Sequence, residues 1–358
     1  MKHLVLVFAT VTLLPVPLLA TGAFWGGLWI WGGVFYLTAL AGVLDAILSL
    51  RLRPNVQEIA AFKADRLSAA LAILHFFLLI LGVWAISSNS GLTVLDRVGA
   101  FFAFGLYFGQ VSNANAHELI HRTSPRLFLL GSWVYISLLF GHHTSAHRRI
   151  HHRYVATPDD PNSARRGESF YRFVPRAWFG SFRAGYEAER ALLKVKRRNF
   201  TRLAHPYVTY VAGGFCCLVL AWFIGGLRGV MALSALAFYA QMQILLTDYV
   251  QHYGLVRRTL SSGKPEPLTD YHSWDAPHWF SGLMTLNAPR HSDHHASPAK
   301  PFPALKLPEG ETSPTLPRSM PVMAVLALMP GRWRRRMDPI AIAWEDRART
   351  AAIRRAVA

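Results

Sequence analysis

Nine histidines lie in short motifs of this sequence, and the neutral histidine ring is the commonest metal ligand in proteins. The motifs are HELIH, HRRIHH, one separate histidine and HSDHH, which contain His117 and His121; His147, His151 and His152; His252; and His291, His294 and His295. Residues three and four apart lie on one face of a helix, so each longer motif presents several rings in one direction. The pattern predicts a polyhistidine metal centre.

A single histidine is usually a surface residue or a hydrogen-bonded core residue. That interpretation does not suit these motifs, because nine of the 16 histidines occupy them. A tetrahedral metal site uses about four ligands, so nine histidines indicate two metal ions. Four others stand near the motifs at irregular spacing, and we expect a polar or ring-orienting role for them: His142, His143, His272 and His278. His3, His75 and His205 are expected to be unconnected with the site.

The composition is that of a membrane protein. Hydrophobic residues make up 52% of the 358 residues and charged residues only 16%, against about 25% charged in soluble domains. The apolar residues occur in runs, each near the ~20 residues that a helix needs to cross hydrocarbon. The predicted spans are 3–20, 23–50, 67–88, 97–116, 207–225 and 229–250. We therefore predict an all-α, integral-membrane fold in a single domain, 1–358, with a histidine-rich cap.

The loop charges predict the topology, because short cytoplasmic loops carry an excess of Lys and Arg. Segments 51–66 and 122–205 and the tail after 251 are rich in basic residues, whereas 87–96 has none. Six spans then place both termini and all nine motif histidines on the cytoplasmic side. Segment 127–141 is apolar but short for a span, and we expect a re-entrant or interfacial helix there.

The net charge of +18 would suggest nucleic acid binding in a soluble protein. Here the basic residues flank membrane spans, so anionic headgroups and the topology bias account for most of it. The basic runs at 332–336 and 194–202 are candidate contacts for an acidic protein. Cys216 and Cys217 are adjacent and no C-x-x-C pair occurs, so electrons for a redox reaction must come from another protein.

Four segments carry a resemblance to a known family: HELIHR, HRRIHHRYVATPDDPNSARRGESFY, DYVQHYGL and NAPRHSDHHA. They resemble the integral-membrane alkane 1-monooxygenases, with xylene monooxygenase as close kin. The resemblance covers most of 110–300 and, through the span pattern, nearly the whole chain. Membrane fatty acid desaturases share the three histidine motifs, but VATPDDPNSARRGESFY, the separate HYGL histidine and RHSDHH favour the hydroxylases.

The resemblance implies a non-haem diiron centre bound by all nine motif histidines. It also implies the reaction: O2 is activated, a hydrogen atom is taken from a methyl group, and hydroxyl returns to give a primary alcohol. Rubredoxin or a ferredoxin, reduced by an NAD(P)H-dependent reductase, is the electron donor that the family uses. The location it implies is the bacterial inner membrane.

Several positions depart from the commonest family pattern. Ala146 stands where the alkane enzymes usually have Glu, and Ile150 where they usually have Gly. Asp248 and Gln251 replace Asn and Glu, and Ala288-Pro289 replaces Leu-Gln. None of these changes removes a ligand, but they leave room for xylene-like or other methyl-bearing substrates beside linear alkanes.

Ligating histidines need a partner for the second ring nitrogen. Glu118, Asp248 and Asp293 stand beside ligand candidates, and we expect them to orient the rings.

Two other functions stay open. A fatty acid desaturase or lipid hydroxylase would use the same kind of centre, and the product would distinguish it by gaining oxygen or losing hydrogen. A histidine-rich metal transporter is the alternative from another class. The histidines lie in cytoplasmic segments and at span ends, and we expect the span interiors to lack the ionisable residues that would mark an ion path.

Overall fold

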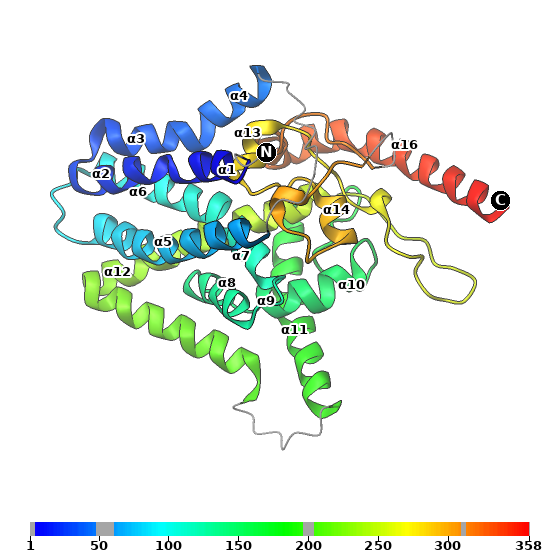
Figure 1. Ribbon diagram of the computed structural model, residues 1–358, viewed down its shortest axis with the longest axis horizontal. Helices are drawn as coiled ribbons and strands as arrows, with labels where there is room; N and C mark the ends of the chain where they lie inside the picture. Colours follow the sequence, from blue (N-terminus) through cyan, green and yellow to red (C-terminus); the bar gives the residue numbers. More distant parts are fainter. Residues whose placement is uncertain (1–3, 48–60, 196–203, 309–312, 358) are drawn as a thin grey trace.

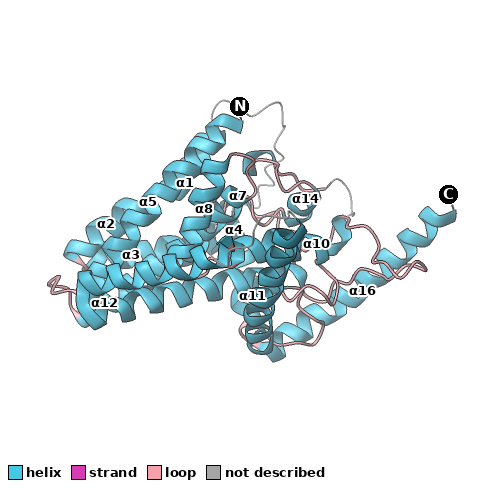
Figure 2. Cartoon of the chain, turned by 90° about the horizontal axis from the view of Figure 1, so that it is seen from below, coloured by secondary structure: helices cyan, strands magenta, loops and turns pink. Residues whose placement is uncertain are grey.

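The computed structural model describes residues 4–47, 61–195, 204–308 and 313–357. Within these ranges the regular elements are helices and no strand is formed (Figures 1 and 2). The predicted all-α class is therefore confirmed.

Four helical stretches are long and apolar enough to cross a membrane. They are Leu4–Trp25, made of α1 (Leu4–Leu13) and α2 (Pro15–Trp25); Gly27–Ile47, made of α3 (Gly27–Phe35), the π-helix η1 (Tyr36–Leu40) and α4 (Ala41–Ile47); Lys63–Ser87, in α5 (Ala61–Ser87); and Pro206–His252, which is α12. In Figure 1 they run side by side across the view. Their length and composition support a membrane protein.

Helix α12 is 47 residues long and holds both predicted spans 207–225 and 229–250. Its helical dihedrals break at Gly225 and Gly226, where Gly226 has φ 58° and ψ −142°. Gly26, between α2 and α3, has nearly the same dihedrals, φ 60° and ψ −143°. Residues with a Cβ rarely adopt this conformation. Figure 1 shows that the two limbs of α12 fold back on each other at this break.

The close approach of the two α12 limbs yields a stability prediction. A Cβ on Gly229 would lie 2.0 Å from the carbonyl oxygen of Ala221 in the other limb. Gly229→Ala should therefore force the limbs apart and destabilise the protein by about 1–3 kcal/mol, measured as a lower thermal midpoint in detergent. Gly42→Ala in α4 is the matched control, because a Cβ there meets nothing within 4 Å. An equal midpoint in both variants would contradict this account.

The predicted span 97–116 falls on three consecutive elements and is not among the four candidate stretches. These are α6 (Val94–Tyr107), the π-helix η2 (Phe108–Ser112) and α7 (Asn113–Ile120). The apolar segment 127–141 forms the short helix α8 (Pro125–Ser137), which packs against α5, α7 and α12. Together these elements enclose the end of α7, where the first histidine motif lies.

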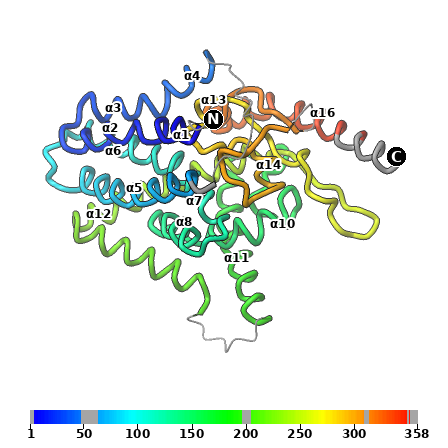
Figure 3. Tube along the Cα trace, viewed as in Figure 1, coloured from blue at the N-terminus to red at the C-terminus, as the bar shows by residue number. Residues whose placement is uncertain are grey.

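The remaining helices gather at one end of the spans (Figure 1). They are α9 (His143–Ala146), the π-helix η3 (His147–His151), α10 (His152–Tyr154), α11 (Phe170–Val195), the 3-10 helix η5 (Asp270–His272), α13 (Trp279–Met284), α14 (His291–Ala296), the 3-10 helix η6 (Phe302–Ala304), α15 (Met320–Ala327) and α16 (Pro330–Val357). The Cα trace in Figure 3 shows α7, α10 and α14, far apart in sequence, close together at this end.

The C-terminal helix α16 braces the end of α12. Trp333 of α16 is fully buried and its ring lies 5.4 Å from that of Tyr249 and 5.2 Å from that of Tyr253. The Tyr253 hydroxyl donates to Asp338 at 2.6 Å. Because Tyr253 directly follows His252, these contacts hold one of the motif histidines in place.

Candidate metal centre

The structure brings all nine predicted histidines together in two groups. Group A contains His117, His121, His147, His152 and His294; group B contains His151, His252, His291 and His295. Within each group the ring nitrogens that face one another lie within 4.8 Å. A metal ion can be held at each, so the two-site expectation has a geometric basis.

Five elements supply the rings. Both HELIH histidines, at the end of α7, belong to group A, and His252 joins group B from the last residue of α12. HRRIHH lies on η3 and α10, and HSDHH lies on α14. Each of these two motifs is divided between the groups, so neither group forms without chain segments that are distant in sequence.

The π-helix η3 decides how HRRIHH is divided. The backbone N–H of His152 donates to the carbonyl of His147, five residues earlier, the spacing of a π-helix. His147 and His152 therefore face each other, with their Nε2 atoms 2.9 Å apart, while His151 belongs to group B. The spacing of an α-helix would place His147 and His151 on one face; in η3 their rings lie 5.0 Å apart but belong to different groups.

Group A has the geometry of a metal site. Nε2 of His147 lies 2.8 Å from that of His117, and Nε2 of His152 lies 3.1 Å from that of His294. Two nitrogens bound to one metal at about 2.1 Å and at right angles would be about 3.0 Å apart. Nε2 of His121 is buried and has no hydrogen-bond partner in the described part of the chain. A cation at this point would satisfy the converging nitrogens.

Group B repeats this arrangement. Nε2 of His291 lies 2.9 Å from that of His252 and 3.0 Å from that of His295. Nε2 of His151 is buried, and none of the described residues hydrogen-bonds it. The donor set of both groups is imidazole alone, which suits iron, zinc or copper.

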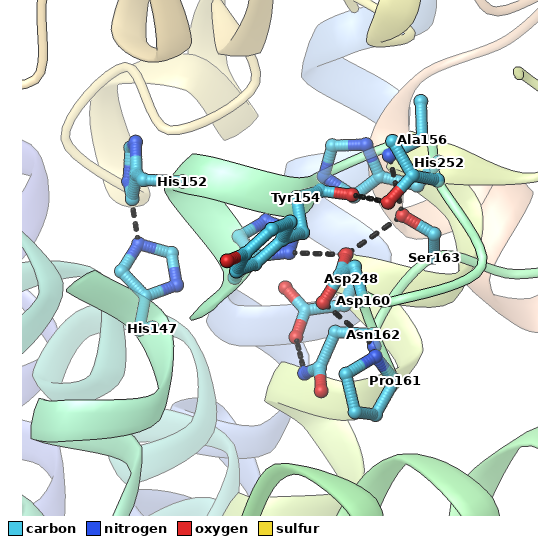
Figure 4. Close-up of polar contacts among 12 residues, drawn as sticks. His147, His152, Tyr154, Ala156, Asp160, Pro161, Asn162, Ser163, Asp248 and His252 are labelled. Carbon is cyan, nitrogen blue, oxygen red and sulfur yellow. Dashed lines mark hydrogen bonds and ion pairs between the residues drawn. The ribbon is translucent and has the colours of Figure 1, made fainter. Parts of the chain in front are cut away.

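A buried carboxylate orients His151. Nδ1 of His151 lies 2.9 Å from Oδ2 of Asp160, and because a carboxylate only accepts, that nitrogen carries the proton and leaves the Nε2 lone pair for a metal. Asp160 also accepts from the Ser163 hydroxyl at 2.7 Å and from the backbone N–H of Asn162 at 3.0 Å (Figure 4). The Asn162 amide in turn donates to Asp248 at 2.6 Å. This network belongs to the loop that follows the second motif.

The three carboxylates expected to orient rings make other contacts. Glu118 pairs with Arg122 and accepts from the backbone N–H of Phe302 at 2.9 Å. Asp293 pairs with Lys300 at 2.6 Å. Asp248 accepts from Asn162, so its link to His151 passes through Asn162 and Asp160. These residues brace the segments that carry the histidines, whereas the carboxylate that the structure describes in direct contact with a ring of group A or B is Asp160.

Sequence reasoning missed Asp160 and Asp275. Asp275 is fully buried and accepts hydrogen bonds from the backbone N–H and from the hydroxyl of Ser292, a residue of α14. Asp160 lies in the quoted motif PDDP, nine residues after His151, and that motif was the available signal. For Asp275 no signal was available, because nothing in its spacing links it to α14.

Two of the other histidines near the motifs, His272 and His143, lie beside the two groups. The carbonyl of His272 lies 3.4 Å from Nδ1 of His252, and His272 Nε2 lies 3.3 Å from Glu266. His143 is buried, with its ring stacked on Phe140 and 5.0 Å from the ring of His147. His3 and residues 196–202 of the basic run 194–202 lie outside the described residues.

Electrostatics keep most of the rings neutral. Burial, followed by neighbouring rings, holds the pKa far below its usual range for His121, His147, His152, His291, His294 and His295. Neutral imidazole is the form that binds a metal. Burial acts in the same direction on His151, but the Asp160 carboxylate outweighs it and raises the pKa of His151. Positive charge is thus best tolerated at His151.

A cavity of about 150 Å³ reaches both groups. It touches His117 of group A and His291 of group B. Apolar side chains form much of its wall: Ile244, Leu246, Met284 and Met320. The cavity is partly open to the outside, so an apolar molecule has room beside the rings of both groups.

The fold and the site define a class, a helical membrane protein with two polyhistidine groups. The sequence profile of the family described as "Fatty acid desaturase" matches residues 92–326. The chain belongs to this family.

Curated relatives refine this placement. The chain is similar to alkane 1-monooxygenase 2 of Alcanivorax borkumensis, with 30% identity over 70% of this chain and 65% of that protein. Alkane 1-monooxygenase 1 of Pseudomonas aeruginosa is 34% identical over 68% of this chain and 64% of its own length. The xylene/toluene monooxygenase hydroxylase component of Pseudomonas putida is 28% identical over 87% of this chain and 82% of its own length. The chain thus spans about two thirds of the length of the first two relatives, and the resemblance predicted from the motifs is confirmed.

Proposed function

We propose that this protein is an O2-dependent hydroxylase that converts a terminal or benzylic methyl group of an apolar substrate to a primary alcohol. Two non-haem iron ions, held by groups A and B, are the proposed cofactors. The cavity carries this proposal, because it touches one histidine of each group and most of its wall surface is apolar. The names of the relatives, alkane 1-monooxygenase and xylene/toluene monooxygenase, support the same reaction.

The balance of the reaction sets what the protein must supply. One oxygen atom of O2 enters the C–H bond, and the other leaves as water after two electrons and two protons are added. Iron, when bound, supplies the activation of O2. The histidines hold it, Asp160 orients His151, and Ile244, Leu246, Met284 and Met320 place the apolar substrate beside both groups.

The electrons require a partner, because the chain has no C-x-x-C pair. Rubredoxin or a ferredoxin, with an NAD(P)H-dependent reductase, is the proposed donor. The run 332–336 supports docking of an acidic protein, since Arg332, Arg334, Arg335 and Arg336 of α16 are exposed. Trp333 between them is buried and anchors the helix. The proposed location is a bacterial inner membrane, with both termini and both groups on the cytoplasmic side.

The desaturase alternative is favoured by one observation, the description of the matching family. It predicts an alkene instead of an alcohol. The transporter alternative was weighed on the expectation that the span interiors lack ionisable residues. That expectation is wrong, because Asp45 and His75 lie in candidate spans. Asp45 accepts from the backbone N–H groups of Phe280 and Ser281, and His75 bonds to the hydroxyl of Ser137. These contacts support structural roles, and metal uptake into vesicles would test for transport.

Product analysis with 18O2 tests the proposed function. Membranes containing the protein, NADH, and a rubredoxin or ferredoxin with its reductase are given octane, xylene or a fatty acid. We expect one labelled oxygen on a terminal or benzylic carbon, detected by mass spectrometry. An alkene without label would establish the desaturase instead. If an iron-loaded, reduced protein gave no oxygenated product from any of the three, the hydroxylase proposal would be rejected for these substrates.

A further inference from the structure

The short helix α15, Met320–Ala327, was not expected from the hydropathy pattern. It is apolar throughout, with the sequence MPVMAVLA. It packs against α12 and α4, both parts of candidate spans, and against α16. Met323 and Ala327 are buried and hold the helix against the protein. An apolar helix attached to the side of the spans has one face toward the protein and another toward its surroundings.

The two faces of α15 meet different environments. Met320, Pro321 and Ala324 line the cavity that reaches both histidine groups. Val322 and Val325 point outward, with 44% and 61% of their surface exposed. Exposed valines beside candidate spans are suited to contact lipid. The wall between the cavity and the exterior is therefore a single helix thick at this point.

The size of the cavity limits what it encloses. A cavity of about 150 Å³ has room for a molecule of about the size of benzene, and the cavity beside α15 has this volume. Only the reacting end of a longer hydrocarbon would fit within it. Because the cavity is partly open, the remainder of such a molecule would extend past the cavity wall, and an apolar molecule concentrates in the bilayer outside that wall.

We propose that α15 is the lipid-side wall of the substrate site, and that Ala324 sets the size of the apolar molecule that enters from the bilayer. This inference rests on the proposed function for the fate of the bound molecule. That an apolar molecule binds behind α15 is inferred from the position of α15 alone and does not depend on the proposed function. Ala324 is the suitable position, because its small side chain borders the cavity and a larger one there would occupy the space of the substrate.

Two variants and a control test the wall. Ala324→Phe fills the cavity strongly and Ala324→Leu fills it partly. Val325→Phe adds the same ring to the next residue of the same helix, but on the exposed face. All proteins are full-length, metal-loaded and reconstituted in lipid nanodiscs, and equal metal content shows that each variant has folded.

The first readout is the rise in thermal midpoint that octane causes, which reports binding without turnover. We expect octane to raise the midpoint of the wild type and of Val325→Phe equally, with a smaller rise in Ala324→Leu and none in Ala324→Phe. An equal rise in all four proteins would overturn the inference. So would the absence of any rise in the wild type, because octane would then not bind in the cavity.

The second readout is the ratio of kcat/KM for xylene to that for toluene, which differ by one methyl group. Ala324→Phe should lower this ratio at least about tenfold, the usual cost of one methyl group in a filled pocket, and Val325→Phe should leave it unchanged. An unchanged ratio in Ala324→Phe counts against the size-setting role. If octane protects the wild type but no alcohol forms, the proposed function fails, and the thermal readout alone decides the assignment of the wall.

Discussion

His294→Ala should release the metal from group A and lower product formation at least about 100-fold, more than the loss of a residue that merely orients a ligand. His294 is the one residue of α14 that reaches group A, and its Nε2 lies 3.1 Å from that of His152. Alanine leaves a buried gap there that no neighbouring side chain of the group fills. His151→Ala should do the same in group B, where His151 is the ring that η3 contributes.

The metal content separates the two groups. Measured by inductively coupled plasma mass spectrometry, each variant should retain the metal of the unchanged group, so that iron falls to about half of the wild-type value. His75→Ala is the control: His75 is fully buried in α5 and bonds to Ser137, but it belongs to neither group. It should cost stability and leave the iron content unchanged. Full iron and full turnover in both ligand variants would refute the ligand assignment.

Asp160→Asn should weaken metal binding in group B by about 10–100-fold, the usual effect of removing a hydrogen-bond partner from a ligating histidine. The carboxylate accepts from three donors, His151, Ser163 and the backbone N–H of Asn162. An amide of the same size has one accepting oxygen, and its NH2 group would face a donor. With the amide oxygen at the position of Oδ2, its NH2 group faces the backbone N–H of Asn162; with the oxygen at the position of Oδ1, the NH2 group faces His151 and Ser163. In either case the His151 ring loses the negative charge that stabilises it when it binds a cation.

Chelator competition measures this loss. Metal should leave group B of Asp160→Asn at a lower chelator concentration than in the wild type, while group A keeps its metal. Asp159→Asn is the matched control, because Asp159 is the adjacent residue in the same motif and is exposed. If both variants lost metal alike, the effect would come from the loop as a whole and the orienting role of Asp160 would be rejected.

The membrane fold was partly predictable, because hydropathy reports length and composition of each apolar run. Hydropathy located the apolar runs that form the four candidate stretches, but it could not show where the helices within each stretch begin, end or reverse. Gly225 ends the predicted span 207–225 and Gly226 follows it, yet α12 reverses at these two glycines without an intervening loop. The span predicted at 97–116 contains a π-helix, which no hydrophobic pattern reveals. The role of α15 was also hidden, since eight apolar residues are too few for a span signal.

The sequence by itself determined the family and the candidate metal-ligating residues of this protein. The histidine motifs indicate a candidate imidazole metal site and their flanking residues indicate the family, because both are properties of local residue type and spacing. Only the tertiary structure decided how the nine rings divide into groups of five and four. That division depends on the π-helical turn of η3 and on the packing of α7, α12 and α14, whose residues are remote in sequence. Spacing along a helix shows which rings share a face, but the partner that each face meets is set by how the helices pack.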